Sequence, residues 1–493
     1  MLVAAAVVVV VATKILGGLG ADWRPSHFDE WRTLALAQRF VESGALVAEE
    51  PIGSPNGLAR DISDRNRSLG FVALFGAWIK VAAKPIAHFK ALALGFVLLY
   101  LAGVYLLCRS VGVRPWATVP AVLGLGALPT DAMLLGPALA VPSSLSLGLL
   151  CFALVAHLRL SNRSPTSGTA RTGLWWATLI GVAASLAIVY PLTLIVFTGL
   201  VAIDGLARPS LLRTRYGRWL GTLGGLGIVL FLLGEWRGDF SSTADHFANL
   251  FVLDQAWHLV NFYVYRLDYM VLAPLLLLAF AGAGVSLFED LPKDAERDRL
   301  WLAAAFLGPV FAVLVYQDLG VGLVVPYQRV GLFLGFGALL CAGVAVERML
   351  VAMEARSYPG WFAAIVIGAS SLAIVFSPRP APPYEGPLSV LRPEPILEAV
   401  AHKIAQKFSP PTRFFAAPRD SLYLEALTGL RASPVSLDAL LTGFAPPPID
   451  CEAGWEIIVG RYDCPNYLLA FRVDDFPVYE KRHGDDSRDQ SPP

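Results

Sequence analysis

Long apolar segments recur along residues 1–377 and then stop, and this pattern restricts the chain to a fold that spans a membrane. Of its 493 residues, 55% are hydrophobic and only 16% are charged, whereas an average soluble domain is about 25% charged. The predicted spans are residues 2–19, 91–108, 116–129, 137–158, 174–189, 192–206, 219–234, 269–288, 301–316, 330–346 and 362–377. Several are shorter than the roughly 20 residues that a helix needs to cross a bilayer, so their limits are approximate. The predicted fold class is mainly α, a polytopic transmembrane helical bundle with about eleven spans.

The distribution of arginine orients these spans. Treating the apolar stretch 69–83 as an interfacial or re-entrant helix, and not as a span, places a set of arginines in the cytoplasm, as the positive-inside rule favours. The set consists of Arg109, Arg114, Arg159, Arg163, Arg171, Arg208, Arg213, Arg215 and Arg218. The chain is then a multi-pass protein of the cell membrane, with its N-terminus inside and residues 378–493 outside.

The sequence predicts two domains. Residues 1–377 form the transmembrane domain, whose first outer loop is 20–90, and residues 378–493 form a small extracytoplasmic α/β domain with a helix near Pro395–Lys407. Cys451 and Cys464 lie close enough in sequence to pair, and an oxidising compartment permits the bond. Closing this loop is worth about 3 kcal/mol on the chain-entropy model. Two unpaired thiols remain the alternative.

An acidic pair, Asp29 and Glu30, follows the first apolar segment. Ser26 three residues before Asp29 matches the capping box that opens a helix. The helix then presents Trp31, Leu34, Ala37 and Val41 on one side and ends at Gly44, a common residue after a C-cap. Asp29 therefore has a structural explanation as a helix cap, favoured by the helix dipole. Two adjacent acids exceed what a cap requires, so a catalytic role stays open beside it.

Other charged residues gather on the same predicted outer face. Asp131 lies in a sharp turn between two spans, where a turn-forming aspartate is the simple explanation. The outer cations are Lys84, His88, Lys90, Arg266 and Arg329. Each could merely extend toward lipid headgroups. Arg329, which directly precedes an apolar helix, is the best candidate for holding a phosphate, because the guanidinium fork matches phosphate oxygens.

Composition and motifs exclude several functions. The formal net charge is zero, so no electrostatic footprint for a nucleic-acid partner exists. The sequence contains no Walker motif, no complete G-x-G-x-x-G after a strand and no G-x-S-x-G elbow, which argues against nucleotide use and serine hydrolysis.

The order of these features resembles the GT-C superfamily of membrane glycosyltransferases, in particular protein O-mannosyltransferases and aminoarabinose transferases. Its members open the first outer loop with an acidic pair in the pattern acid-acid-x₆-Ala, matched here by Asp29, Glu30 and Ala37. The further similarities are the interfacial helix 69–83, the acid Asp131, the bend at Tyr190-Pro191 and a soluble tail with strands at Trp455–Gly460, Tyr467–Arg472 and Asp475–Glu480. The Trp-Trp-Asp motif of oligosaccharyltransferases is absent, and Asp61–Arg67 stands where mannosyltransferases carry His-Pro-Pro.

The resemblance implies an inverting transfer of sugar from a polyprenyl-phosphate donor to an acceptor hydroxyl outside the cell. Asp29 would be the general base, and Arg329 would stabilise the departing phosphate, supported by Arg266, Lys84, His88 or Lys90. Glu30 or Asp131 would orient the acceptor or hold a divalent metal ion, since some relatives require a metal and others do not. The implied partners are the lipid-linked donor, membrane lipid and a glycan, lipid or protein acceptor.

Two alternatives belong to other classes. A transporter or flippase of lipid-linked saccharides should carry ionisable residues in the middle of its spans, whereas almost none lie there in this sequence and the polar residues collect at the predicted outer face. A non-catalytic envelope scaffold would leave Asp29 as a helix cap. The sequence does not name the sugar, the carrier lipid, the acceptor or the oligomeric state.

Overall fold

The structure of the protein is a computed structural model. It describes residues 1–12, 25, 28–44, 69–128, 139–161, 169–208, 211, 214, 216–219, 221–222, 267–288, 300–319, 327–377, 395–409, 412–432, 451 and 455–482. The chain divides into two compact units. The first unit contains Met1–Trp23 and Phe89–Glu385, and the second contains Arg24–His88 and Gly386–Pro493.

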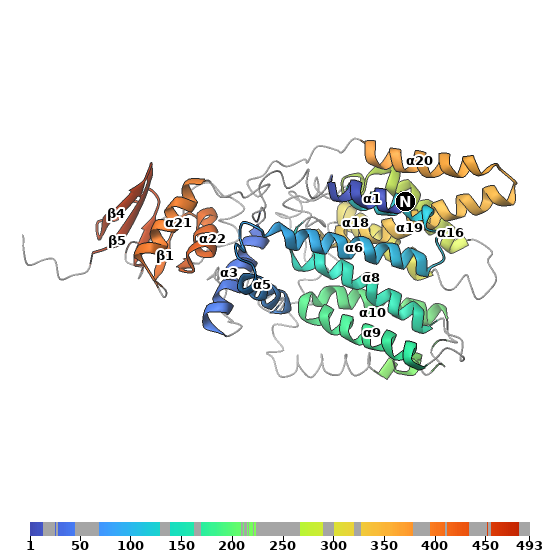
Figure 1. Ribbon diagram of the computed structural model, residues 1–493, viewed down its shortest axis with the longest axis horizontal. Coiled ribbons are helices and arrows are strands. Elements are labelled where there is room, and N and C mark those ends of the chain that lie inside the picture. Colours follow the sequence, from blue (N-terminus) through green and yellow to red (C-terminus); the bar gives the residue numbers. More distant parts are fainter. Residues whose placement is uncertain are drawn as a thin grey trace, which may run out of the picture. The chain divides into compact units, whose positions relative to one another are not determined.

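All secondary structure in the described residues of the first unit is helical (Figure 1). Its helices are α1 (Leu2–Val10), α6 (Lys90–Ser110), the 3₁₀ turn η2 (Trp116–Thr118), α7 (Val119–Ala127), α8 (Pro142–Ser161), α9 (Thr169–Val189), α10 (Pro191–Ala207), α15 (Leu267–Met270), α16 (Ala273–Phe288), α18 (Leu300–Leu319), α19 (Tyr327–Ala355) and α20 (Gly360–Phe376). Within the described residues, four helices are long and apolar enough to cross a membrane, in α6, α8, α9 and α19, and the other apolar helices are shorter. The chain is therefore an integral membrane protein with a mainly helical fold, as predicted.

The predicted spans overlap these helices, although residues 13–19 of the first span and most of 219–234 lie outside the described residues. Several limits differ by a few residues: α9 starts at Thr169 and not at 174, and α16 starts at Ala273 and not at 269. Helix α8 starts at Pro142 and not at residue 137, since proline favours the first helical position. Helix α19 continues well past the predicted end at residue 346. That prediction ended the segment at the first charged residue, Glu347, which is in fact paired with Arg114.

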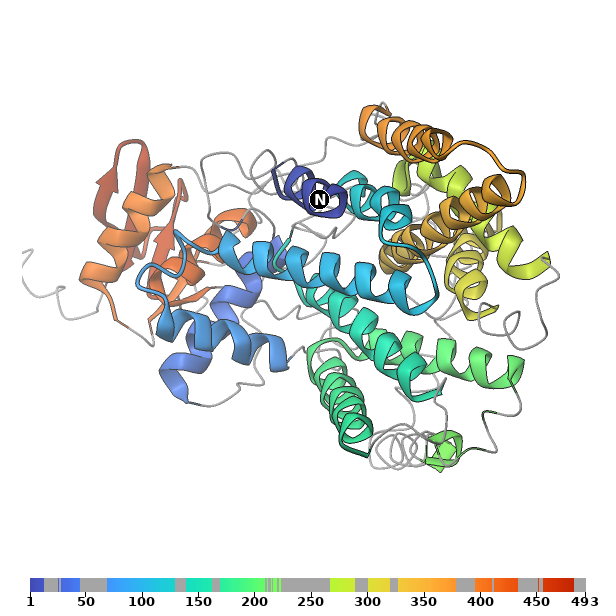
Figure 2. The same cartoon turned by 45° about the vertical axis from the view of Figure 1, so that its right-hand side comes forward.

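Helix α19 is the centre of the first unit. It packs against α7, α16 and α18. Of the residues in its most apolar stretch, 94% are buried inside the protein, compared with 17% for the corresponding stretch of α9. Close approach depends on glycine: a Cβ atom at Gly282 of α16 would lie 1.9 Å from the Cys341 carbonyl oxygen, and one at Gly337 would lie 2.3 Å from that of Ala305. Small residues allow such backbone contact between membrane helices. Helices α6 and α8 also lie side by side, as both views show (Figure 2).

The second unit joins two helices from residues 28–81 to the C-terminal domain. Its elements are α3 (Phe28–Ser43), α5 (Leu69–Val81), α21 (Pro395–Lys407), β1 (Arg413–Phe415), α22 (Pro418–Thr428), β2 (Arg431–Ala432), β3 (Ile457–Val459), β4 (Tyr467–Val473) and β5 (Phe476–Lys481). The predicted helix 395–407 is confirmed, and the three predicted strands correspond to β3, β4 and β5. Their order in the sheet is β2-β1-β3-β5-β4, with β1 parallel to β2 and β3 and the other pairs antiparallel.

The two faces of this sheet carry different clusters, because neighbouring side chains on a strand point in opposite directions. Phe414, Ile457 and Val459 pack with Val400 of α21 and Leu424 of α22 in one apolar core. The intervening residues face a second cluster that includes the cysteine pair. The clusters shared by strands and helices make this an α/β domain, as the sequence predicted.

Candidate functional site

Helix α3 carries the predicted acidic pair in its first turn. It begins at Phe28, so Asp29 is its second residue and Glu30 its third. The capping box with Ser26 as the N-cap predicts Asp29 at the third position instead. Ser26 and the side chain of Asp29 lie outside the described part of the chain. The predicted end is confirmed: Gly44 has φ +70°, and its N–H donates to the Phe40 carbonyl over 3.0 Å. Only glycine adopts this conformation without strain.

Glu30 is the acid whose surroundings the structure describes. Its side chain is 0% exposed and interacts with neighbouring groups. Three residues of the predicted apolar side of α3 are also buried, with Trp31, Leu34 and Ala37 each at most 1% exposed, while Val41 is half-buried. A charged group is rarely removed from water in this way without partners. Capping alone does not require this burial, and a role for Glu30 beyond the cap stays a prediction.

The predicted outer cations divide between the two units. Lys84 and His88 are exposed in the turn that follows α5 in the second unit. The Trp78 indole N–H donates to the Pro85 carbonyl over 3.0 Å and holds this turn. Lys90, the first residue of α6, is buried in the first unit.

Three predicted site residues are only partly described or not described. Arg329 is the third residue of α19, and its side chain lies outside the description. Asp131 and Arg266 lie wholly outside the described residues. Among the residues that are described, no group of three His, Cys, Asp or Glu side chains is arranged to hold a metal ion.

An apolar groove of ≈ 260 Å³ lies between α10, α18 and α19. All of its lining residues are apolar: Val196, Leu200, Ala304, Ala305, Gly308, Pro309, Ala312, Val330, Phe333 and Phe336. Pro309 interrupts the backbone hydrogen bonding of α18 here. One of the lining residues, Val330, directly follows Arg329 in the sequence. Such a lining suits an apolar ligand.

Sequence reasoning missed a buried polar cluster in the first unit. The two ring nitrogens of His157 on α8 contact Tyr216 Oη at 2.6 Å and Asp204 Oδ2 at 2.8 Å. Asp204 on α10 is also bound by the Arg208 guanidinium, whose Nε donates to Oδ1 over 2.9 Å. The signal in the sequence was one ionisable residue near the end of each of two apolar segments, His157 in 137–158 and Asp204 in 192–206. Burying such a residue in a membrane is costly unless it has a partner.

A second missed contact holds the loop after α6. The Arg114 guanidinium binds both Glu347 and Glu354 on α19, and its backbone N–H donates to Glu347 Oε2 over 2.8 Å. These carboxylates raise the pKa of Arg114, although its partial burial opposes the charge. Both polar clusters join neighbouring helices and involve none of the predicted outer acids.

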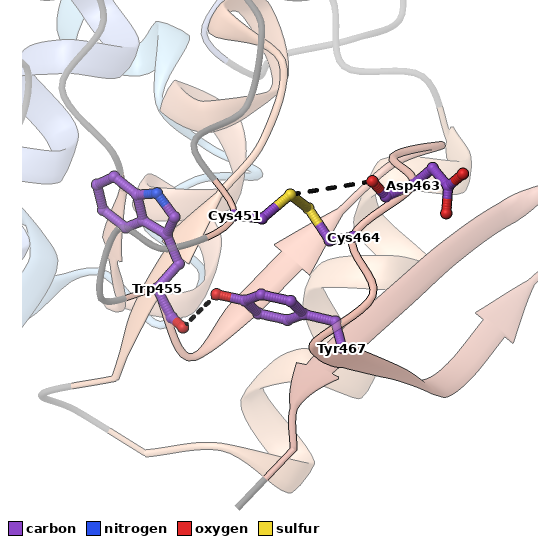
Figure 3. The surroundings of a disulfide bond; sticks show 5 residues. All are labelled: Cys451, Trp455, Asp463, Cys464 and Tyr467. Carbon is purple, nitrogen blue, oxygen red and sulfur yellow. Dashed lines mark hydrogen bonds between the residues drawn. A yellow bond between two sulfur atoms is a disulfide. The ribbon is translucent and has the colours of Figure 1, made fainter.

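The cysteine pair of the C-terminal domain is joined in the structure (Figure 3). The Cα atoms of Cys451 and Cys464 are 5.6 Å apart. Beside the bond, the Tyr467 hydroxyl donates to the Trp455 carbonyl over 2.7 Å, and the Asp463 carbonyl oxygen lies 3.9 Å from Cys451 Sγ. This bond holds the segment before β3 against the segment that enters β4, and it fits the oxidising compartment that the predicted topology implies.

Comparison with solved structures identifies the fold. ArnT from Cupriavidus metallidurans bound to undecaprenyl phosphate is 14% identical, matches over 97% of both chains and gives a TM-score of 0.52. The Archaeoglobus fulgidus oligosaccharyltransferase tethered to an acceptor peptide containing the NVT sequon is also 14% identical, with a TM-score of 0.54. That match covers 88% of this chain but only 63% of the longer archaeal protein.

No protein-family model matches this chain, and no curated protein matches it in sequence. The two solved structures are both GT-C membrane glycosyltransferases. At this level of identity the likeness concerns the fold. The protein described here therefore has the fold of the GT-C membrane glycosyltransferases, with its transmembrane helices and its C-terminal α/β domain both part of the match.

Proposed function

We propose that this protein is a membrane glycosyltransferase that moves a sugar from a polyprenyl-phosphate donor to an acceptor hydroxyl on the extracytoplasmic face. The observation that carries the proposal is the apolar groove between α10, α18 and α19, whose lining residue Val330 follows Arg329. A lipid-linked sugar needs a hydrocarbon site with a cation at the phosphate end. The fold shared with undecaprenyl-phosphate-bound ArnT supports the same donor class.

The proposed reaction is one displacement at the anomeric carbon. Asp29 accepts the proton of the acceptor hydroxyl as its oxygen attacks. The bond from the anomeric carbon to the phosphate oxygen breaks, and the polyprenyl phosphate leaves with the electron pair. A single displacement inverts the anomeric centre.

The leaving phosphate needs fixed positive charge more than a proton, because it is already an anion. Arg329 supplies that charge in the proposal, with Arg266, Lys84, His88 and Lys90 as the supporting cations. Glu30 and Asp131 are assigned to orienting the acceptor. Their carboxylates are also the ligand type for a divalent metal, which would polarise the phosphate. The burial of Glu30 suits a fixed, oriented carboxylate.

Binding of undecaprenyl phosphate to the full chain in lipid nanodiscs tests the donor site. Gly308 lines the groove and a Cβ atom there meets nothing within 4 Å, so the larger side chain of Gly308→Leu should fill the groove and weaken binding at least tenfold. Gly368→Leu, at another glycine with open space around its Cβ atom, is the matched control because it does not line the groove. Equal binding by both variants would contradict the proposed donor site.

The charge of Arg329 is tested in the same assay. Arg329→Gln should weaken undecaprenyl-phosphate binding, whereas Arg356→Gln, which removes an exposed arginine just beyond the other end of α19, should not. The reaction class is tested by mass spectrometry of envelope glycans and lipids from cells with and without the protein. A transferase forms a new glycosidic bond and releases free polyprenyl phosphate, while a transporter moves the lipid-linked saccharide intact.

A further inference from the structure

We infer that the C-terminal domain holds the acidic helix of the first outer loop in place, with Tyr423 as the positioning residue for Asp29 and Glu30. The inference deepens the proposed function and rests on it for the catalytic role of the acids. The elements concerned, α3, α5 and α22, all belong to the second unit. Nearly 400 residues of sequence separate Asp29 from Tyr423.

The first contact is at the acidic end of α3. The rings of Trp31 and Tyr423 meet edge to face, with centroids 5.0 Å apart and an interplanar angle of 89°. Trp31 is 0% exposed and Tyr423 is 1% exposed. Because Trp31 directly follows Glu30, its ring fixes the rotation of α3 at the residue next to the acidic pair. Edge-to-face geometry is a preferred aromatic arrangement and is specific in direction.

The second contact is near the other end of α3. Gly429, which follows α22, has φ +72°, and a Cβ atom there would lie 2.8 Å from Glu42 Oε1 and 3.3 Å from Gln38 Nε2. The backbone conformation requires glycine here, and the ends of the Glu42 and Gln38 side chains of α3 lie against it. At 1.5 Å per residue, Trp31 and Glu42 are about 16 Å apart along the helix. Two contacts at that separation define the direction of the helix axis as well as its rotation.

Helix α5 supports α3 from a further direction. A Cβ atom at Gly76 of α5 would lie 2.7 Å from Phe40 Cδ1 and 3.5 Å from Val41 Cγ2. This contact involves α3 residues different from those that meet α22. Helix α3 is therefore held by α5 and by the C-terminal domain together, and removing the α22 contact should loosen α3 without unfolding α5.

The expected consequence is a defect in turnover and not in donor binding. A general base misplaced by about 1 Å can lose on the order of 100-fold in rate, while the groove and Arg329 belong to the first unit. Tyr423→Ala should therefore lower kcat at least tenfold and leave the Kd for undecaprenyl phosphate within twofold of wild type. Tyr423→Phe, which keeps the ring, should restore kcat. Leu468→Ala, at a half-exposed position of the same domain, is the control for general damage to the domain.

The experiment uses the full chain in nanodiscs and has two readouts. Turnover is measured as release of undecaprenyl phosphate from an undecaprenyl-phosphate-linked sugar in the presence of a cell-envelope extract that supplies the acceptor hydroxyl, and the mobility of α3 is measured by amide hydrogen exchange over residues 28–36. We expect faster exchange in Tyr423→Ala and wild-type exchange in Tyr423→Phe and Leu468→Ala. Unchanged exchange in Tyr423→Ala, or an equal kcat for the Ala and Phe variants of an active protein, overturns the inference. Faster exchange in a protein whose wild type releases no undecaprenyl phosphate refutes the proposed function and leaves the anchoring of α3 supported.

Discussion

His157 Nε2 lies 2.8 Å from Asp204 Oδ2, and this contact joins the C-terminal parts of α8 and α10. Both residues are 1% exposed, and Arg208 completes an ion pair with the same carboxylate. Burying a lone charge is costly, whereas a buried group whose partners are all present is tolerated. The cluster therefore holds the membrane helices α8 and α10 together through polar contacts. Its contribution to stability depends on every member being present.

Loss of the shared carboxylate should destabilise the protein. Asp204→Ala leaves the Arg208 guanidinium and the His157 imidazole without their common partner, and breaking a buried ion pair costs about 3–5 kcal/mol. The apparent Tm of the full chain in detergent should fall accordingly. Glu354→Ala is the control, because it removes a side chain that is 63% exposed and pairs with Arg114, where the cost is about 1 kcal/mol or less. Equal shifts in Tm for the two variants would contradict the prediction.

Tyr462 should limit the alkaline stability of the C-terminal domain. Burial, with a smaller contribution from Asp420, raises the pKa of Tyr462 to about 12, compared with about 10 in an unfolded chain. The folded state therefore keeps its proton at a pH where the unfolded state has lost it. The resulting stability is fully present below pH 10 and is lost as the pH rises from 10 to 12.

Removing the phenol oxygen isolates this effect from the other titrating groups. Tyr462→Phe keeps the ring contact with Phe415, whose centroid is 5.2 Å away. The apparent Tm of wild type should therefore fall more steeply above pH 10 than that of Tyr462→Phe. Parallel curves for the two proteins would show that the ionisation of Tyr462 is not coupled to unfolding.

The helices were predictable from sequence because the membrane imposes one simple requirement on each of them. A run of apolar residues satisfies it whatever the run packs against, so α6 and α10 match their predicted limits closely. The helix α21 and the Cys451–Cys464 bond were predictable for a similar reason, since each depends on neighbouring sequence alone.

The contacts between distant segments were not predictable in this way. Nothing near Trp31 in the sequence indicates that its ring meets Tyr423, because an aromatic residue on a helix face is compatible with many partners. The same holds for His157 and Asp204, where the sequence shows two costly residues but not that they satisfy each other. For the candidate site, the pattern placed Asp29 and Glu30 at the start of a helix, but the burial of Glu30 follows from packing that only the structure reveals.

Gly282 should tolerate no side chain. Glycine to alanine inside a helix usually stabilises a protein by about 0.5–1 kcal/mol, but a Cβ atom at Gly282 would lie 1.9 Å from the Cys341 carbonyl oxygen. Gly282→Ala must therefore push α16 away from α19 and should lower the apparent Tm. Gly284→Ala, two residues along the same helix with nothing within 4 Å of its Cβ atom, should leave the Tm unchanged or raise it. A Gly282→Ala protein as stable as Gly284→Ala would contradict the close packing of these helices.

The two acids of α3 should respond differently to isosteric substitution. Asp29→Asn cannot accept the acceptor's proton, and removal of a general base lowers rates by about 10²–10⁴-fold. The lost charge at the second residue of the helix costs only about 0.3–1 kcal/mol through the dipole, so the protein should still fold and insert. Glu30→Gln instead changes a buried group, and its effect should include a lower apparent Tm. Turnover and Tm measured on both variants in nanodiscs separate the roles. A fully active Asp29→Asn protein would make Asp29 a helix cap and transfer the proposed base to Glu30 or Asp131.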